Sequence, residues 1–411
     1  MTSARRLLPV VPLLVAVVLL ASCSTTTRSD ASTGSDASTT ASAPTSSTAS
    51  STTTPTVPAP VINASPALGS TNLNPVTGLT IGVAGGTITD LTLTNPDGKV
   101  VAGALNADNT VWTLGEELGY GKTYTVAGHS TNSAGTQFPI TGIYTTVAPG
   151  DTVRTMISPG DGKVVGVAAP VIVSFGVEPA DRAAVEKAVS ITTTPAIEGA
   201  WAWIEHADGQ WALDYRPKSY WPSGTVVHVE AKMYGVDFGN GNWGRQDVTS
   251  DFTIGRNQVV LADVNSHDMI VQRDGVTVAT YPASYGKGTT RGTTTRSGIH
   301  VATEFYETKF MTNEKYGYVN LEEHWAVRIS NNGEFIHANP GTVGSQGSTN
   351  VSHGCVNLSD ANAKAYMKSA IYGDPVEVTG TDVQLSAEDG DLYDWAVPWE
   401  KWVTMSGKNA A

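Results

Sequence analysis

Cysteine is scarce in this chain, which has two cysteines, Cys23 and Cys355, among 411 residues. Basic residues are also few, because 25 Lys and Arg face 38 Asp and Glu and give a net charge of −13. No stretch is basic enough to hold a row of phosphates, which excludes nucleic acid as a partner. The chain also lacks an apolar run of membrane-spanning length at its N-terminus, where Leu7–Leu20 is too short for a comfortable span.

What the N-terminus does contain is the pattern of a secretory signal. Two arginines precede the apolar run, and small residues follow it. The stretch Leu20–Cys23 resembles a bacterial lipobox, which implies cleavage before Cys23 and a diacylglycerol on its thiol; the alternative is an ordinary signal peptide with an incidental cysteine. We expect an exported protein, held by Cys23 at the outer face of the cytoplasmic membrane and in the cell wall, because two acyl chains give a firm anchor.

A lipidated Cys23 cannot pair with Cys355, so the second cysteine is expected to be a free thiol in an exported protein. Export usually brings disulfides. An unpaired thiol therefore needs a reason, and nucleophilic chemistry is the usual one.

Composition divides the remaining chain into modules. A Ser/Thr/Ala/Pro-rich segment with almost nothing to bury predicts a disordered tether. Two stretches of short alternating strands and Pro/Gly turns predict tandem immunoglobulin-like sandwiches, and a third β-rich unit carries one main helix. The predicted segments are 1–23 (lipoprotein signal), 24–60 (tether), 61–149 and 150–256 (immunoglobulin-like domains), 257–380 (catalytic domain) and 381–411 (a Trp-rich tail packed on the catalytic domain).

Candidate chemistry gathers around Cys355. A neighbouring imidazole can take the thiol proton. His353 lies two residues before the cysteine, and His337, at the end of another predicted strand, could reach it from across the sheet. A helix capped by Ser359 begins four residues after the cysteine, so its N-terminus could face the site. Gly354 permits a tight turn, which would leave its N–H and that of Cys355 free to hydrogen-bond an oxyanion.

These residues resemble the signature of the L,D-transpeptidases, whose catalytic domain is of the YkuD type. The resemblance consists of Ile-His337, a gap of fourteen residues and then Ser-His-Gly-Cys-Val-Asn at 352–357, reinforced by TRSGIHV upstream and GDPVEV downstream. It implies a peptidoglycan acyltransferase in which Cys355 attacks a donor tetrapeptide stem at diaminopimelate and releases D-alanine. An amine of a second, acceptor stem then takes the acyl group, which forms a 3→3 cross-link.

The resemblance also implies roles for individual residues. His337 would be the base, the Gly354 and Cys355 amides would hold the oxyanion, and the Ala338 carbonyl would orient the imidazole. Inhibition by carbapenem β-lactams follows by the same resemblance, and no cofactor is implied. The implied catalytic residues are Cys355, His337, His353 and Gly354, and the implied substrate-binding residues are Ser352, Asn357, Tyr318, Met311 and Ala338. One departure from the family is Gly341, where close relatives have a tryptophan.

Two other functions are compatible with the same residues. The same thioester could pass to water, which would make the protein a thiol L,D-carboxypeptidase or endopeptidase. Alternatively, His337, His353 and Cys355 could bind zinc in a non-catalytic surface lipoprotein, although no carboxylate or second cysteine stands at ligand spacing.

Overall fold

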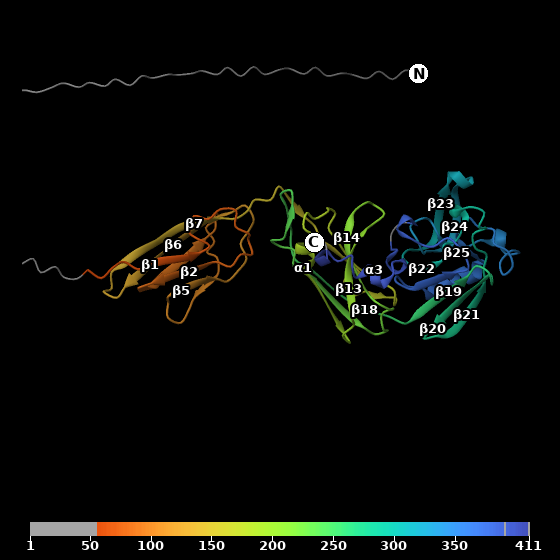
Figure 1. Cartoon of the computed structure of the whole chain (residues 1–411), viewed down its shortest axis with the longest axis horizontal. Helices are drawn as coiled ribbons and strands as arrows, with labels where there is room; N and C mark the ends of the chain where they lie inside the picture. Colours follow the sequence, from red (N-terminus) through yellow and green to blue (C-terminus); the bar gives the residue numbers. More distant parts are fainter. Residues whose placement is uncertain (1–55, 390–391, 410–411) are drawn as a thin grey trace, which may run out of the picture. The chain divides into compact units, whose positions relative to one another are not determined.

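The computed structural model describes residues 56–389 and 392–409 (Figure 1). The predicted signal, Cys23 and nearly all of the tether lie outside these ranges. Inside them the fold is mainly β, as the sequence predicts, and no helix is both long and apolar enough to cross a membrane.

The first module within the described residues is a sandwich of two antiparallel sheets, with strand orders β1-β2-β5-β4 and β3-β6-β7. Along β6, exposed and buried residues alternate, as expected for a sheet with one face on a core. Trp112 and Tyr144 bring the two sheets into one apolar cluster. The strands are β1 (Val61–Ser65), β2 (Thr80–Ala84), β3 (Gly86–Thr94), β4 (Gly103–Leu105), β5 (Val111–Leu114), β6 (Thr123–Asn132) and β7 (Gln137–Thr145).

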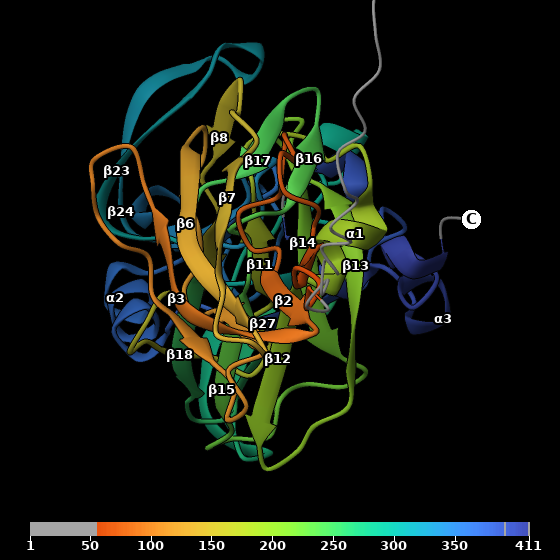
Figure 2. The ribbon, with the colours of Figure 1, turned by 90° about the vertical axis from the view of Figure 1, so that its left-hand side faces the viewer.

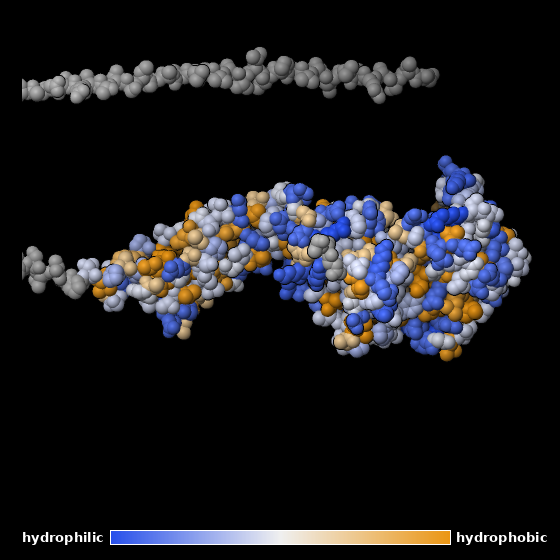
Figure 3. Space-filling view, in the orientation of Figure 1, coloured by the Kyte–Doolittle hydropathy of each residue, from blue (hydrophilic) through white to orange (hydrophobic). Residues whose placement is uncertain are grey.

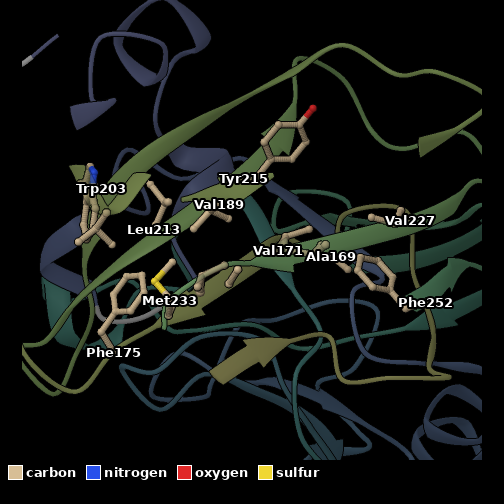
Figure 4. Close-up of a cluster of buried hydrophobic side chains, with 14 of the residues drawn as sticks. Ala169, Val171, Phe175, Val189, Trp203, Leu213, Tyr215, Val227, Met233 and Phe252 are labelled. Carbon is tan, nitrogen blue, oxygen red and sulfur yellow. The ribbon is translucent and has the colours of Figure 1, made fainter. Parts of the chain in front are cut away.

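The second module repeats the sandwich plan with sheets β13-β14-β11-β9 and β10-β18-β15-β12, and β16-β17-β8 adds a small third sheet. Figure 4 shows members of its core, including Leu213 from one main sheet and Phe252 from the other. The elements are β8 (Asp151–Val153), β9 (Met156–Ser158), β10 (Val164–Val165), β11 (Val171–Ser174), α1 (Arg182–Lys187), β12 (Val189–Thr194), β13 (Gly199–Glu205), β14 (Trp211–Pro217), β15 (Val226–Ala231), β16 (Asp237–Gly239), β17 (Asn242–Gly244) and β18 (Val248–Ile254).

The third module packs a five-stranded sheet, β21-β20-β19-β27-β22, with a four-stranded sheet, β23-β24-β25-β26. Most neighbouring strands are antiparallel, but β19 pairs with β27 and β25 with β26 in parallel. The elements are β19 (Gln258–Asp263), β20 (Asp268–Arg273), β21 (Val276–Pro282), η1 (Arg291–Thr293), β22 (Gly298–Val301), β23 (Phe305–Asn313), η2 (Glu314–Tyr316), β24 (Tyr318–Arg328), β25 (Phe335–Ala338), η3 (Pro340–Thr342), β26 (Val356–Leu358), α2 (Asp360–Ser369) and β27 (Pro375–Thr379).

The predicted helix and its cap are confirmed. The Ser359 side chain accepts a hydrogen bond from the Asn362 N–H at 3.3 Å, and Asp360 occupies the first turn, where a negative charge suits the helix dipole. Ala363 and Tyr366 are buried in the core shared by the two sheets. The helix thus covers the four-stranded sheet that carries the candidate site.

The C-terminal tail is divided between two modules, which corrects the prediction that it packs on the catalytic domain. Its first part does so, since Asp389 pairs with Arg296. Its second part packs on the second sandwich, where Trp402 is fully buried and its Nε1 donates to the Ala200 carbonyl at 2.9 Å. Figure 1 shows α3 beside β13. The tail elements are η4 (Ala387–Asp389), η5 (Asp394–Ala396), α3 (Trp399–Trp402) and η6 (Gly407–Asn409).

Arg216 of the second sandwich holds this part of the tail. Its guanidinium donates to the backbone carbonyls of Asp394 and Val397 at 3.1 and 2.7 Å, and it lies within 5.4 Å of the ring centroids of three tail tryptophans. A buried guanidinium needs such partners. The predicted attachment of the tail by its tryptophans is therefore confirmed, but on a different surface.

Candidate active site

The parallel pair β25 and β26 brings the sequence motif together. His337 lies opposite Asn357 in this register, and Cys355 is the residue just before β26. His337 is buried, whereas the Cys355 side chain is half-buried and its Sγ lies 3.5 Å from the Gly333 carbonyl oxygen. His337, eighteen positions upstream, thus becomes a neighbour of Cys355 because β25 and β26 run side by side.

The loop that carries Cys355 is held by its own polar atoms. The Ser352 hydroxyl donates to the Cys355 carbonyl at 2.6 Å and accepts from the Gly354 N–H at 3.1 Å. From the other side, the buried Thr295 hydroxyl donates to the Gly354 carbonyl at 2.8 Å. These bonds fix the backbone at Gly354 and Cys355 from both sides.

Gly354 serves this loop through its backbone conformation. Its φ of +128° lies in a region that side chains rarely adopt, although a Cβ there would meet no atom closer than 3.7 Å. The expectation that its N–H is free is wrong in this conformation, since that N–H is bonded to Ser352 Oγ. Among the described residues, the Cys355 N–H has no hydrogen-bond acceptor, so it remains available to a substrate oxyanion.

His337 is oriented through one nitrogen. Its Nδ1 lies 2.9 Å from the Ala338 carbonyl oxygen, as the family resemblance implies, and 3.1 Å from Glu323 Oε2. Both partners are acceptors when Glu323 is ionised, so Nδ1 carries a proton. The other nitrogen, Nε2, is then left to exchange a proton with Cys355.

The electrostatics of His337 favour its charged form. Burial lowers the pKa of the ring, but hydrogen bonds to Cys355 and Glu323 and the negative charges of both raise that pKa to about 10. A positively charged imidazolium beside a thiol favours the thiolate, which is the reactive form of a cysteine nucleophile.

Two cavities, bounded by described residues, meet at Cys355. The larger cavity, of about 440 Å³, is also lined by Lys309, Lys315 and Arg328. The smaller cavity, of about 350 Å³, is also lined by His337 and Asn357. Residues common to both are Met311, Tyr316, Tyr318, His353 and Cys355.

The wall between the two cavities comes largely from the β23–β24 hairpin, which projects from its sheet (Figures 1 and 2) and ends in a hydrophilic tip (Figure 3). Met311 and Tyr318, two of the substrate-binding residues that the resemblance implies, belong to this hairpin. The His353 ring stacks on Tyr316 with centroids 5.0 Å apart and lies 6.0 Å from the Tyr318 ring. Burial and the nearby Lys287 lower the pKa of His353. His353 therefore contacts the hairpin, and no hydrogen bond joins it to Cys355 within the described ranges.

Other expectations need correction. The Ala338 side chain is buried in the core, so this residue acts through its carbonyl and does not contact substrate. The Ser352 hydroxyl is occupied by two hydrogen bonds within the cysteine loop, one to the Cys355 carbonyl and one from the Gly354 N–H. Its role is therefore to hold this loop. The N-terminus of α2 does not face the sulfur, because β26, about 10 Å long, lies between them.

Asn357 faces the smaller cavity. Its amide nitrogen donates to Thr342 Oγ1 at 3.3 Å, and its buried Oδ1 has no hydrogen-bond partner among the described residues. Asn357 therefore lies at the edge of this cavity with its Oδ1 enclosed by protein atoms.

The zinc alternative finds no support in the arrangement of side chains. In the described part of the chain, no group of three or more His, Cys, Asp or Glu side chains is arranged to hold a metal ion. His353, the third proposed ligand, instead stacks on Tyr316.

Sequence reasoning missed Glu323, which contacts His337. The histidine next to it in sequence, His324, takes no part in the site, because its side chain is 46% exposed and hydrogen-bonded to Thr308. Strand alternation could have placed Glu323 on the face of Leu321, away from His324. Thr295 was also missed, and no local signal marked it.

Comparison with known proteins agrees with this architecture. A family model described as the L,D-transpeptidase catalytic domain matches residues 257–378, and one for a bacterial Ig domain matches residues 70–237. The chain is 48% identical over 350 residues to L,D-transpeptidase 5 of Mycobacterium tuberculosis, covering 85% of this chain and 77% of that relative. It is 36% identical to L,D-transpeptidase 2 of the same species, covering 85% of each.

Among solved structures, a complex of the LD transpeptidase LdtMt1 with imipenem is 35% identical, has a TM-score of 0.47 and covers 56% of this chain and 99% of its own. The sequence comparisons define the class as an acyltransferase that cross-links peptidoglycan. The chain belongs to the L,D-transpeptidase family.

Proposed function

We propose that Cys355 is the nucleophile of this L,D-transpeptidase and that His337 is its general base and acid. The observation that carries the proposal is the position of the sulfur. The sulfur is half-buried where the two cavities meet, and the buried ring of His337 lines the smaller cavity. A transfer reaction needs access for two substrates to one nucleophile, and this arrangement supplies it.

In the first half-reaction, the Cys355 thiolate attacks the carbonyl of diaminopimelate in a tetrapeptide stem. The Cys355 N–H stabilises the oxyanion. When the tetrahedral intermediate collapses, the C–N bond to D-alanine breaks and His337 Nε2 gives its proton to the leaving amine. The product is a thioester and free D-alanine.

In the second half-reaction, the amine of an acceptor stem loses a proton to His337 and attacks the thioester carbonyl. The C–S bond breaks, the 3→3 amide bond is complete, and the thiolate and imidazolium are restored. This cycle needs no redox partner and returns both residues to their starting states.

The charges of the two cavities support a division between the stems. Lys309 and Lys315 form no salt bridge with a described residue; their ammonium groups lie 4.0 and 5.6 Å from the ring centroids of Tyr306 and Tyr316. They suit the carboxylates of a donor stem in the larger cavity. The smaller cavity is lined by no lysine or arginine of the described residues, which suits the acceptor amine.

Incubation of the full chain with a disaccharide-tetrapeptide, followed by mass spectrometry of the products, tests this function. We expect a dimer whose mass equals two substrates minus one D-alanine. A tripeptide alone would show that the thioester passes to water and would favour the L,D-carboxypeptidase alternative. An unchanged substrate would overturn the proposed activity.

The protein is further proposed to act from a lipid anchor at Cys23, at the outer face of the cytoplasmic membrane. The support is the sequence pattern that ends at this residue. Replacement of Cys23 by alanine should move the protein from the membrane fraction to the soluble fraction and leave the transfer activity unchanged. Replacement of the neighbouring Ser24 by alanine is the control. Retention of the Cys23→Ala protein in membranes would contradict the anchor.

A further inference from the structure

Glu323 is a buried carboxylate for which the proposed reaction has no use. Its side chain is 8% exposed and lines the smaller cavity with His337 and Cys355. Among the described residues, the His337 ring is the one hydrogen-bonding or ion-pairing partner of this carboxylate, at 3.1 Å. A buried carboxylate without a countercharge is costly, so its ionised form requires a positive charge on that ring.

An irregularity in the sheet places Glu323 on the correct face. At the core end of the β24–β25 pair, Val327 lies opposite Ile336. If that register continued, Trp325 would lie opposite Ala338 and on the same face of the sheet. Glu323, two residues before Trp325, would then also lie on the face of Ala338. Beyond the irregularity His324 lies opposite Ala338, so Glu323 shares the face of His337 instead.

The residue that absorbs this shift is Trp325. Its φ of +53° lies in the left-handed region, which is unfavourable for a bulky side chain. Two contacts compensate. Its Nε1 donates to Asp360 Oδ1 at 2.9 Å, and the Lys364 ammonium lies 4.4 Å from its ring. Bulges of this kind often lie beside active sites, where they redirect a side chain.

We propose that Glu323 is a positioning residue that keeps His337 protonated and thereby maintains Cys355 as a thiolate at neutral pH. This inference rests on the proposed roles of Cys355 and His337. The Ala338 carbonyl alone would fix the ring's direction, but a neutral carbonyl cannot distinguish imidazolium from imidazole as strongly as a carboxylate does. The Ala338 carbonyl thus orients the His337 ring, and the Glu323 carboxylate stabilises its positive charge.

Among the described residues that line the two cavities, the one other carboxylate is Glu334, which pairs with Arg296 at 3.1 Å. The smaller cavity is also lined by Tyr316, Tyr318 and His353. Burial raises the pKa of Tyr318, so that phenol stays neutral at neutral pH, and a histidine ring is either neutral or positive. Behind β25, α2 contributes Tyr366, whose pKa burial also raises. Cys355 itself is the one further negative partner of the ring.

The test measures the alkylation of Cys355 by iodoacetamide between pH 5 and 10, with peptide mapping to separate it from other thiols. Glu323→Gln keeps the shape and a hydrogen-bond acceptor but removes the charge. Loss of an opposite charge at this distance changes a pKa by about one to three units. At pH 7, we expect Cys355 of Glu323→Gln to be alkylated at least about tenfold more slowly than Cys355 of the wild type. At pH 10 the two rates should be equal, because the thiol is then ionised in both proteins.

The matched control is Glu322→Gln, which makes the same charge change at a neighbouring carboxylate that is 54% exposed and faces His324. It should follow the wild-type profile, and Glu323→Asp, which keeps the charge, should restore most of the reactivity at pH 7. Parallel profiles for Glu323→Gln and wild type, or an equal loss at pH 7 and pH 10, would overturn the inference.

A measurement on the wild type guards against misfolding of the variants. Nitrogen NMR should show both ring nitrogens of His337 protonated at pH 8, and a neutral ring at that pH would overturn the inference without any substitution. The outcome is also independent of the transfer assay. A protein that gives the expected alkylation profile but no stem dimer refutes the proposed function and not the role of Glu323.

Discussion

Replacement of Cys355 by alanine is expected to abolish both cross-link formation and the release of D-alanine. Every bond change in the proposed cycle passes through this sulfur, so the loss should be about a thousandfold or more. The buried loop should survive, because its hydrogen bonds use the Ser352 hydroxyl and backbone atoms and not the thiol. The check is the product assay with disaccharide-tetrapeptide, alongside thermal unfolding of both proteins.

A carbapenem gives the same prediction a second readout. Opening of the β-lactam ring breaks a C–N bond within the drug as the C–S bond forms, so no fragment leaves. Intact-mass spectra of the wild type should therefore gain the mass of the whole drug, whereas Cys355→Ala should gain nothing. Cys355→Ser is the matched control, since its hydroxyl keeps the shape but is a far weaker nucleophile at neutral pH. An adduct on Cys355→Ala would contradict the assignment of the nucleophile.

Features set by local chemistry were predictable from the sequence. The cap at Ser359 depends on residues within one turn, and the residue types of the motif at 352–357 identify a thiol site without any knowledge of the fold. The engagement of the Gly354 N–H could also have been anticipated, because a serine two residues earlier is a common local acceptor. The Ser352 hydroxyl therefore competes with a substrate oxyanion for this N–H.

Features set by pairing between distant segments were not predictable. The direction of Glu323 depends on a shift of one residue between β24 and β25, and such a shift moves a side chain to the other face of a sheet. The tail tryptophans likewise predict burial of the tail. Their spacing, however, does not predict that Trp402 packs beside Ala200 of the second sandwich and not on the catalytic domain. Both outcomes depend on which surfaces meet in the folded chain.

Replacement of His337 by alanine is expected to lower the transfer rate by about 10²- to 10⁴-fold, the range for loss of a general acid–base. An unassisted thiol with a pKa near 8.5 is only about 3% ionised at pH 7, and no group then protonates the leaving amine. The residual rate should therefore rise with pH as the free thiol ionises. A rate equal to wild type at pH 7 would exclude His337 as the base.

The substitution also leaves Glu323 buried without its partner, and loss of one member of a buried ion pair costs about 3–5 kcal/mol of stability. A slow variant could then be slow because it is partly unfolded. The double variant His337→Ala/Glu323→Gln separates the two causes, because it removes the unpaired charge together with the ring. It should unfold at a higher temperature than His337→Ala yet transfer no faster. If activity returned together with stability, the fold and not the proton transfer would be what His337 supplies.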